Sequence, residues 1–428
     1  MTNTPTAADL LDLQRKTFGY FVHEANPANG LVRDNTRYGS PSSIAAVGLG
    51  LTCWPIAVER GYVTRDEAIE RTLATLEFFE GCPQGPAADA SGHRGFFYHF
   101  LDLATGRRAH GCELSTMDTA ILFAGALTAA AYFDRDDPRE ARIRASADWL
   151  YRAADWEWAL DGERTIRHGW TPEGGFLPFR WEGYSEALLL YVLALGSETH
   201  PIAPGSYRAW AATYRWRREY GIEYLYGGPL FMHQFSHLWI DFRGIHDAFL
   251  SERGIDYFEN SRRATEVQQR YGEKNPRGFR GYSREVWGIT ASDGPGPAVR
   301  RVGGRRRRFF DYCARGVPDG PDDGTLSPWA VVASLPFAPE IVLPSLAAIL
   351  RKYPAMRSRY GLLCSFNPTF GGVRGGWIAK GYYGLDQGPV VIMIENFETE
   401  MIWNLIRRSA PVVRGLSRAG FSGGWLDR

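Results

Sequence analysis

Apolar and polar residues alternate along most of this chain with the period of an α-helix. In residues 63–81, VTRDEAIERTLATLEFFEG, the apolar stripe recurs every three or four positions and consists of Ile69, Leu73, Leu76 and Phe79. Thr64 stands where an N-cap is expected, acidic residues fill the first turn, and Gly81 follows the last apolar position. The pattern predicts a half-exposed amphipathic helix over this stretch.

A second group of segments is apolar on nearly every side. Residues 42–61, 115–133 and 185–197 contain few polar side chains, and a helix that is apolar all round is buried all round. Amphipathic segments such as 138–156 and 338–353 occur along the same chain. The sequence thus predicts roughly a dozen helices, in which buried and half-exposed ones tend to alternate.

Alternation of this kind suits two concentric rings of helices, the inner one buried by the outer one. We predict an all-α fold, an (α/α)6 double-ring barrel that forms a single domain over residues 1–428, because no Pro- or Ser-rich linker divides the chain. An irregular all-α domain or a helical solenoid would also use many helices, but no fixed repeat length supports a solenoid. Residues 94–111 resemble a strand hairpin turning at 104–106, which we expect to decorate one end of the barrel.

Several connections between the helices are long and rich in glycine, tryptophan and acidic residues: 168–184, 257–296 (which begins with a polar helix), 317–328 and 366–389. A connection in a compact domain needs only a handful of residues. Long ordered loops either carry function or fill a structural gap, and in a double ring they would gather at one end. We therefore expect them to wall a cleft.

Composition narrows the class of ligand. The formal net charge of the 428 residues is +1, which argues against general affinity for nucleic acid or acidic membrane surfaces. Aromatic residues make up 14% of the chain, and they can fill a large core or form stacking platforms for the apolar faces of sugars. We expect neither nucleic acid nor membrane as a partner, and a monomer.

Cysteine usage and the N-terminal sequence bear on cofactors and location. The five cysteines form no C-x-x-C pair and have no histidine at metal-ligand spacing, so we predict free thiols, no metal and no cofactor. No uncharged apolar stretch is long enough to span a membrane. The first residues lack the apolar core of a signal peptide, which predicts a cytoplasmic protein, or a periplasmic or secreted one if a signal has been removed.

Glu113 and Asp118 flank the start of the apolar segment 115–133. Ser115 or Thr116 can cap this helix, which places Asp118 in the first turn, where the helix dipole favours an anion. A first-turn acid is common in any protein. Because the rest of this helix is apolar, however, Asp118 would face the interior or a cavity, and we regard it as a candidate catalytic acid.

Glu182 and Glu186 stand four residues apart at the start of the apolar segment 185–197, so one helical face would carry both. Two carboxylates that repel each other between a cleft and a core tend to have one raised pKa, as a general acid needs near neutral pH. The structural alternative is a capping glutamate with a solvated neighbour.

A third acidic helix start is Asp386, in an apolar segment that also contains Glu395. Asp322 and Asp323, in the sequence PDDG, fit ordinary turn chemistry instead. Several helix starts that lie far apart in the sequence thus present carboxylates among Trp, Tyr and Gly. Paired carboxylates in an aromatic cleft are the groups that cleave glycosidic bonds.

Other chemistries lack their motifs. The chain has no G-x-S-x-G, no Walker loop and no H-E-x-x-H. His233, His237 and His246 include a pair with metal-like spacing but without the accompanying glutamate, and we interpret them as core or substrate-contacting residues. We interpret the arginine-rich run 300–308 as a solvated loop rather than a phosphate site.

Five long segments carry a family resemblance: IDYFENSRRATEVQQRY, GYSREVWGITASDGPG, PDDGTLSPWAVVASLPFAPE, GGWIAKGYYGLDQGPVVIMIENFETEMIWNLIR and FRWEGYSEALLLYVLALGS. They resemble the glycoamylase-like family, which includes the endo-β-1,2-glucanases of glycoside hydrolase family 144, and the likeness runs from Gly19 to Phe421. It implies an (α/α)6 barrel that hydrolyses β-1,2-glucan with inversion at the anomeric carbon and releases sophoro-oligosaccharides. Related members act as exo-type glucosidases or release sophorose.

By position, the resemblance places the catalytic acids: Asp118, Glu186 or Glu182, and Asp386. Candidate substrate-binding residues come from the cleft loops and helix starts: Glu113, Trp181, Tyr184, Tyr282, Glu285, Trp287, Asp293, Trp377 and Tyr382. We expect Tyr282 and Trp287 to offer flat faces to glucose rings; the alternative for Trp287 is a plug at the end of the barrel. The arginine-rich stretch 299–309 departs from the family pattern beside this cleft.

The sequence therefore predicts a glycoside hydrolase that acts on β-1,2-linked glucans. One alternative is a glucan-binding protein that keeps the barrel without turnover. Another is an exo-acting glucosidase, or an enzyme for another linkage such as that of α-glucans, on the same fold. The acids retained at every expected position favour the enzyme.

Overall fold

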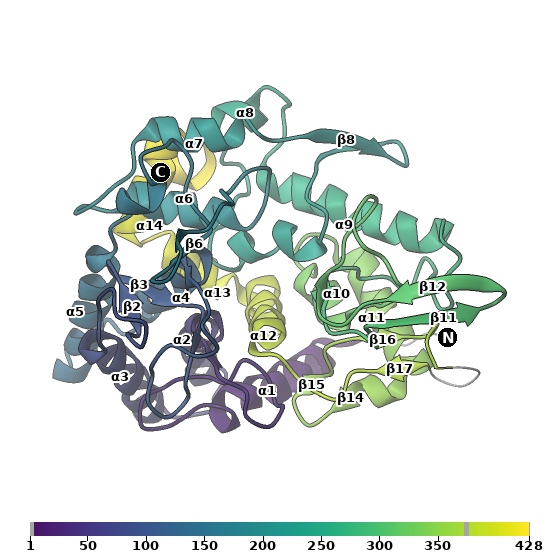
Figure 1. The fold of residues 1–428 in the computed structure, drawn as a ribbon, viewed down its shortest axis with the longest axis horizontal. Coiled ribbons are helices and arrows are strands. Elements are labelled where there is room, and N and C mark those ends of the chain that lie inside the picture. Colours follow the sequence, from purple (N-terminus) through teal and green to yellow (C-terminus); the bar gives the residue numbers. More distant parts are fainter. Residues whose placement is uncertain (1–3, 372–375, 428) are drawn as a thin grey trace.

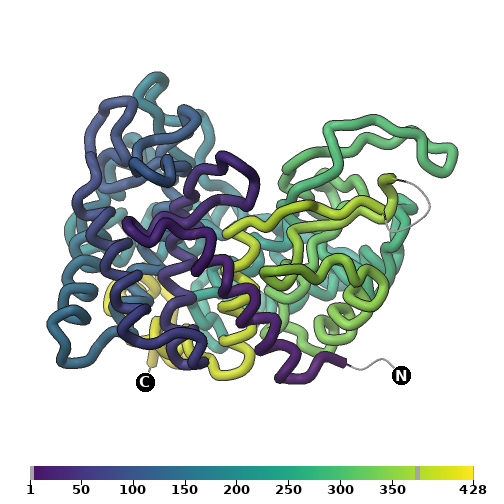
Figure 2. The backbone as a smooth tube through the Cα atoms, turned by 90° about the horizontal axis from the view of Figure 1, so that it is seen from below, coloured from purple at the N-terminus to yellow at the C-terminus, as the bar shows by residue number. Residues whose placement is uncertain are grey.

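The structure is a computed structural model that describes residues 4–371 and 376–427. It is rich in helices (Figure 1). Figure 2 shows the start of α1 and the C-terminal end of the described chain on the same side of the molecule. Within the described residues, no helix combines the length and the apolar character needed to cross a membrane.

Buried and half-exposed helices alternate along the chain, as the apolar patterns predict. The buried ones are α2 (Ile44–Glu59), α4 (Thr116–Tyr132), α6 (Ala187–Gly196), α10 (Pro328–Ala333) and α12 (Gly384–Thr399). The half-exposed ones are α1 (Ala7–His23), α3 (Arg65–Gly81), α5 (Pro138–Ala153), α7 (Pro204–Ala211), α9 (Tyr257–Lys274) and α11 (Pro339–Lys352). Shorter helices are α8 (Ala248–Ser251), α13 (Met401–Ile406) and α14 (Ala410–Ala419), with 3₁₀ turns η1 (Trp158–Leu160), η2 (Leu230–His233), η3 (Phe235–Leu238), η4 (Pro354–Met356) and η5 (Gly424–Asp427).

Hydroxyl side chains fix where several helices begin. Ser43, Thr64 and Ser115 each accept a hydrogen bond from the backbone N–H three residues further on, at the starts of α2, α3 and α4. Such a cap satisfies one of the backbone donors that a helix start leaves unpaired. The predicted caps Thr64 and Ser115 are confirmed.

Glycines bring the buried helices into backbone contact. A Cβ atom added to Gly48 of α2 would lie 2.3 Å from the carbonyl oxygen of Ile121 in α4, and one added to Gly125 of α4 would lie 2.0 Å from the carbonyl oxygen of Gly48. Gly388 of α12 leaves similar room for Leu49 of α2. A side chain at these positions would push the helices apart, so the glycines set their spacing.

The strands form small antiparallel sheets. The largest has the order β2 (Gly92–His93), β3 (Phe96–Tyr98), β5 (Leu114–Ser115), β6 (Gly169–Thr171) and β7 (Gly175–Phe176). The two-stranded pairs are β1 (Ser42–Ser43) with β4 (Phe100–Leu101), β8 (Trp216–Glu219) with β9 (Ile222–Leu225), β10 (Ala291–Ser292) with β13 (Cys313–Ala314), β11 (Ala298–Val302) with β12 (Arg305–Phe309), β14 (Arg357–Ser358) with β15 (Gly361–Leu362), and β16 (Phe366–Asn367) with β17 (Trp377–Ile378). Because β1 and β5 run directly into α2 and α4, these strands lie at the N-terminal ends of buried helices.

The hairpin predicted over 94–111 forms only in part. A turn does close between Asp102 and Arg107, and Leu101 pairs with Arg108. Strand β3, however, pairs with β2 and β5 instead of the other arm of the predicted hairpin. The pairing of β3 with β5, directly before α4, therefore replaces the hairpin that the local sequence predicts.

The arginine-rich run is largely exposed to solvent, as predicted, but the prediction that it forms a loop is wrong. Strands β11 and β12 pair over five residues each. Gly303 and Gly304 between them both have positive φ angles, 57° and 76°, which a two-residue turn of type I′ requires. The paired glycines flanked by valine and arginine were a hairpin signal in the sequence.

Candidate active site

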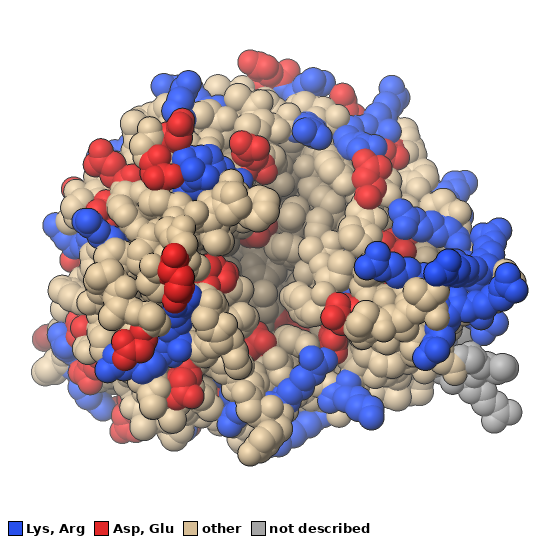
Figure 3. All heavy atoms as spheres, viewed as in Figure 1, with Lys and Arg blue, Asp and Glu red and all other residues tan. Residues whose placement is uncertain are grey.

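The N-terminal ends of the buried helices meet at a cavity of about 520 Å³. Its lining includes one or two residues at each of these ends: Ser43 before α2, Ser115 and Asp118 at α4, Glu186 before α6, Trp329 of α10 and Asp386 of α12. Figure 3 shows the molecule hollowed at the centre of this face, with acidic side chains in and around the hollow. Because helix N-termini carry partial positive charge, they favour ionised carboxylates at this place.

His99 lies between two carboxylates of the cavity wall. Its Nδ1 is 2.8 Å from Oε1 of Glu113, and its Nε2 is 3.7 Å from Oδ1 of Asp118. Burial acts to lower the pKa of His99, but Asp118, Glu113 and Asp34 outweigh it and raise the pKa to about 9. Burial likewise acts to raise the pKa of Glu113, and the hydrogen bond and charge of His99 more than offset it. At neutral pH this cluster therefore holds an imidazolium beside an ionised Glu113.

Asp118 is held by the cap of its own helix. Its backbone N–H donates to Oγ of Ser115 at 3.1 Å, and this hydroxyl donates in turn to Oδ2 of Asp118. The other carboxylate oxygen faces His99. Asp118 is thus fixed in the first turn of α4, facing the cavity, where the sequence predicts it.

Glu186 immediately precedes α6 and is 8% exposed. Its Oε2 is buried and has no hydrogen-bond partner among the described residues. Burial, assisted by the charge of Asp118, raises the pKa of Glu186 to about 7. A carboxyl group that keeps its proton close to neutral pH can deliver it to a leaving oxygen.

Asp386 is a second buried carboxyl group in the cavity lining, 2% exposed in the first turn of α12. Burial raises its pKa well above the ordinary value, although a hydrogen bond with the Cys364 thiol acts in the opposite direction. The pKa of Asp34, which also lines the cavity, is raised by burial as well. The cavity therefore combines carboxyl groups whose pKa values are raised by burial with the ionised Glu113.

Aromatic rings form part of the cavity wall. Trp181 stacks on His168 with ring centroids 4.0 Å apart, and its Nε1 donates to Oγ1 of Thr116 at 3.1 Å. Tyr312 is 48% exposed, and its ring centroid lies 5.6 Å from that of Tyr383. Rings fixed in this way can offer flat apolar faces to a sugar.

One arginine of the lining is positioned by an acid behind it. Arg37 donates a hydrogen bond to Asp293 and lies 5.8 Å from the centroid of the Tyr383 ring. Asp293 itself is 5% exposed and outside the lining. This predicted substrate-binding residue therefore reaches the cavity only through Arg37.

The structure brings some of the predicted site residues to the cavity and leaves the others outside its lining. Those in the lining are Asp118, Glu186, Asp386, Glu113 and Trp181. Those outside it are Glu182, Tyr184, Tyr282, Glu285, Trp287, Asp293, Trp377 and Tyr382.

Glu182 does not share a helical face with Glu186, because α6 begins only at Ala187. Glu182 lies exposed in the preceding loop, whereas Glu186 is buried at the cavity. Of the two acids between which the sequence leaves a choice, position favours Glu186.

The prediction that Tyr282 and Trp287 offer ring faces to glucose does not fit their burial. Trp287 is fully buried, and its Nε1 donates to Oγ of Ser345 in α11 at 2.8 Å. Tyr282 is 8% exposed, and its hydroxyl donates to Asp322 at 2.7 Å. Glu285, in the same loop, forms a surface ion pair. Trp287 therefore packs against the half-exposed helix α11, which fits the structural role kept open as its alternative. Ala291, further along the same connection, does line the cavity.

Three other residues predicted to contact substrate pack against neighbouring protein groups and do not line the cavity. Tyr184 is buried and stacks on Tyr257 with ring centroids 5.7 Å apart. The hydroxyl of Tyr382 accepts a hydrogen bond from the backbone N–H of Tyr360 at 3.2 Å. Trp377 is half-buried in β17, behind the cavity lining. Residues 372–375 of the predicted cleft loop lie outside the described residues.

Two of the histidines singled out in the sequence belong to the core. His233 Nε2 lies 3.1 Å from the carbonyl oxygen of Gly227, and His237 Nε2 lies 3.0 Å from Oγ of Ser261. Burial lowers the pKa of His233 to about 4 and that of His237 to about 3, so both rings are neutral. Neither lines the cavity, and across residues 4–371 and 376–427 no His, Cys, Asp or Glu cluster could hold a metal ion.

Sequence reasoning missed several residues of the lining, among them His99, Asp34, Arg37 and Tyr312. All four lie in bends outside the helices and strands, where no periodic pattern marks a side chain as facing a cavity. They come together only because loops far apart in the sequence meet over the helix ends.

The cavity contains carboxyl groups in both protonation states and is bordered by aromatic rings. Glycoside hydrolases use sites of this type. The model of the family described as "Putative glucoamylase" matches residues 178–410, more than half of the chain. The chain belongs to this glycoamylase-like family, as the sequence resemblance predicts.

Individual relatives agree with this assignment. An exo β-1,2-glucooligosaccharide sophorohydrolase of Parabacteroides distasonis is 29% identical over 453 residues, covering 96% of this chain but only 58% of that relative. A crystal structure from Bacteroides uniformis with the same description as the family matches with a TM-score of 0.87 and 30% identity, covering 99% of this chain and all of the other. An endo-β-1,2-glucanase of Chitinophaga pinensis, in complex with sophorotriose and glucose, matches with a TM-score of 0.86 and 25% identity over 99% of this chain and 100% of that one.

Proposed function

We propose that the chain is a glycoside hydrolase that cleaves β-1,2-glucosidic linkages in β-1,2-glucan or sophoro-oligosaccharides. Relatives named for hydrolysis of β-1,2-linked substrates support the choice of linkage. One observation carries the choice of chemistry: buried, unpartnered Glu186 keeps its proton to about pH 7 in the same cavity as Asp118. A proton donor and a second carboxyl group in one cavity are what glycoside cleavage requires.

We also propose that the helices form an (α/α)6 double ring within one domain. Contacts support a closed inner ring, since α2 packs on α4, α4 on α6, α6 on η3, and α12 on both α10 and α2. The edge-to-face contact between Phe235 of η3 and Trp329 of α10 links the remaining neighbours. The half-exposed helices that alternate with these elements would form the outer ring.

In the proposed mechanism, Glu186 protonates the glycosidic oxygen as the bond to the anomeric carbon breaks. Asp118, held by Ser115 and faced by the His99 imidazolium, orients and deprotonates the attacking water. An inverting enzyme keeps its two carboxyl groups roughly 6.5–9.5 Å apart to leave room for this water. Asp386, whose pKa burial also raises, is the second candidate for the acid.

The test is a substrate panel of linear β-1,2-glucan, sophoro-oligosaccharides, β-1,3-glucan and starch, with chromatography of the products. We expect cleavage of the β-1,2-linked substrates only, and NMR of early products should show the α-anomer if the reaction inverts. Sophorose alone would indicate exo-action, and a ladder of oligosaccharides endo-action. Polymer that is bound but unchanged would identify a glucan-binding protein instead, and faster cleavage of starch would overturn the proposed linkage.

A further inference from the structure

Strands β11 and β12 and their turn, residues 298–309, concentrate positive charge, and we refer to them as the arginine hairpin. It contains no acidic residue and six arginines: Arg300, Arg301, Arg305, Arg306, Arg307 and Arg308. Because the whole chain has a formal charge of +1, the rest of it carries −5. Figure 3 shows a cluster of basic side chains at one edge of the molecule, where Figure 1 places this hairpin.

The register of the hairpin places like charges opposite one another. Arg300 pairs with Arg307, and Arg301 pairs with Arg306. Like charges directly opposite each other destabilise a two-stranded ladder. Within the described residues, no arginine of the hairpin forms an ion pair with a carboxylate. The arrangement costs the fold stability, and a bound anion would relieve the repulsion.

The two faces of the hairpin have different surroundings. Arg307 lies 4.4 Å from the centroid of the Phe279 ring and donates to the carbonyl oxygens of Arg277 and Gly278, so its face turns towards the body of the protein. Successive side chains of a strand point to opposite faces, and cross-strand partners share a face. The opposite face therefore presents three exposed arginines to solvent: Arg301, Arg306 and Arg308.

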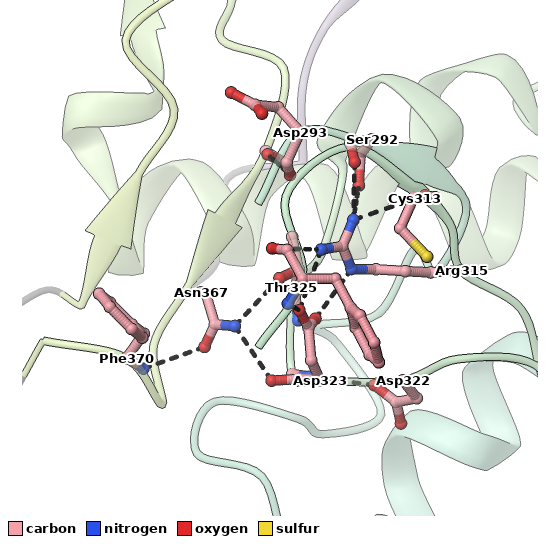
Figure 4. Close-up of polar contacts among 12 residues, drawn as sticks. Ser292, Asp293, Cys313, Arg315, Asp322, Asp323, Thr325, Asn367 and Phe370 are labelled. Atoms are coloured by element: carbon pink, nitrogen blue, oxygen red, sulfur yellow. Dashed lines mark hydrogen bonds and ion pairs between the residues drawn. The ribbon is translucent and has the colours of Figure 1, made fainter. Parts of the chain in front are cut away.

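The hairpin grows out of the cavity wall. Ala291 and Tyr312 line the cavity on either side of it in the sequence, and β10 pairs with β13 at its base. Beneath this base, Arg315 and Asp323 are fully buried and joined by two hydrogen bonds of 2.8 and 2.9 Å, and Arg315 also donates to the carbonyl oxygen of Ser292 at 2.6 Å (Figure 4). The buried pair fixes the hairpin relative to the cavity.

We infer that the arginine hairpin binds phosphate or carboxylate groups carried by a glucan chain whose neutral part occupies the cavity; this inference rests on the proposed function. Guanidinium groups bind both anions through paired N–H donors. A membrane fits less well, because the exposed apolar side chain of the hairpin is Val299 and its tip is Gly303–Gly304, which gives no apolar anchor. Single-stranded nucleic acid fits less well too. Among the described residues, the rings that contact hairpin arginines are Phe279, which is buried, and Phe310, which is half-buried beside Arg308, so neither presents an open face to bases.

The test compares neutral β-1,2-glucan with sparsely carboxymethylated and sparsely phosphorylated derivatives. The variant Arg301→Gln/Arg306→Gln/Arg308→Gln removes the outward charges and keeps the Arg307 anchor. Its matched control, Arg208→Gln/Arg215→Gln/Arg218→Gln, removes three exposed arginines that lie outside the cavity lining. On the anionic glucans we expect the hairpin variant to have a KM about tenfold higher than the wild type at low salt, as for three exposed ion pairs. The difference should shrink in about 0.5 M salt.

On neutral glucan, the wild type and both variants should share one KM. The hairpin variant should melt no earlier than the wild type, because it removes the like-charged Arg301–Arg306 pair. Equal KM values for wild type and hairpin variant on both anionic glucans would overturn the inference. A second result would also overturn it: duplex DNA or anionic lipid vesicles bind the wild type as strongly as anionic glucan does, and the hairpin variant loses this binding to the same extent. Absence of cleavage of neutral glucan by the wild type would refute the proposed function instead, and affinity electrophoresis in gels containing the anionic glucan would then assess the hairpin alone.

Discussion

Replacement of Glu186 by glutamine should change how stability depends on pH. Burial, together with Asp118, holds the pKa of this carboxyl at about 7, whereas its ordinary value is 4.5. Between these values the unfolded chain ionises the group while the folded protein keeps it protonated. The wild-type free energy of unfolding therefore falls as pH rises from about 4.5 to about 7, and it is constant with respect to this group above that range. Glutamine does not titrate, so the free energy of unfolding of Glu186→Gln should not show this decrease between pH 4.5 and 7.

The size of the effect follows from the two pKa values. Each pH unit over which the folded and unfolded states differ by one proton is worth about 1.36 kcal/mol, so between pH 5 and pH 8 the wild type loses about 2.5 kcal/mol. Unfolding 428 residues at about 2.1 cal/mol/K each gives an entropy of about 0.9 kcal/mol/K. The melting temperature of the wild type should therefore fall about 3 °C further than that of the variant.

The measurement is thermal unfolding at pH 5 and pH 8 at constant ionic strength, followed by tryptophan fluorescence. Glu182→Gln is the matched control, because this neighbouring glutamate is exposed and outside the cavity lining. It should behave as the wild type does. Parallel pH dependence of the wild type and Glu186→Gln would refute the argument that burial keeps the proton on Glu186.

Asp118→Asn should lower turnover of β-1,2-glucan about 100-fold or more without an earlier melt, and normal turnover would remove Asp118 from the chemistry. Wild-type turnover should decline as pH rises through about 7, where Glu186 loses its proton; a rise there would contradict its role as proton donor. Trp287→Ala should lower the free energy of unfolding by about 3–5 kcal/mol and spare the KM for oligosaccharides. A raised KM with unchanged melting would restore Trp287 as a cleft residue. Asp323→Asn should cost about 3–5 kcal/mol, because it leaves Arg315 buried without its carboxylate, and an unchanged melting temperature would show that the pair does not anchor the hairpin.

Helix starts were the most predictable part of this site. The cap at Ser115 and the first-turn position of Asp118 depend on residues within three positions of each other, so the sequence contains the whole signal. The apolar character of α6 and α12 was also local, and it pointed to Glu186 and Asp386 as acids at the ends of buried helices. Their shared cavity follows from the alternation of buried and exposed helices.

Side chains in the loops could not be placed in the same way. Trp287 is buried because Ser345 and its helix pack against it, and that contact spans 58 positions of the chain. His99 reaches the cavity through strand pairing at the start of α4, which no periodic pattern reports. A tryptophan in a glycine-rich loop has the same local signal whether it faces a sugar or a neighbouring helix.

Gly48 and Gly125 fix the distance between α2 and α4 at the level of the main chain. Moving these helices apart to widen the cavity would break their backbone contacts, and a side chain introduced elsewhere could not restore such contacts. The loops above it can lengthen at little cost, because the entropy of closing a loop grows only slowly with its length. Substrate range can therefore diverge within the family while the helical frame stays constant, and libraries confined to the loops should yield new specificities more often than libraries confined to the buried helices.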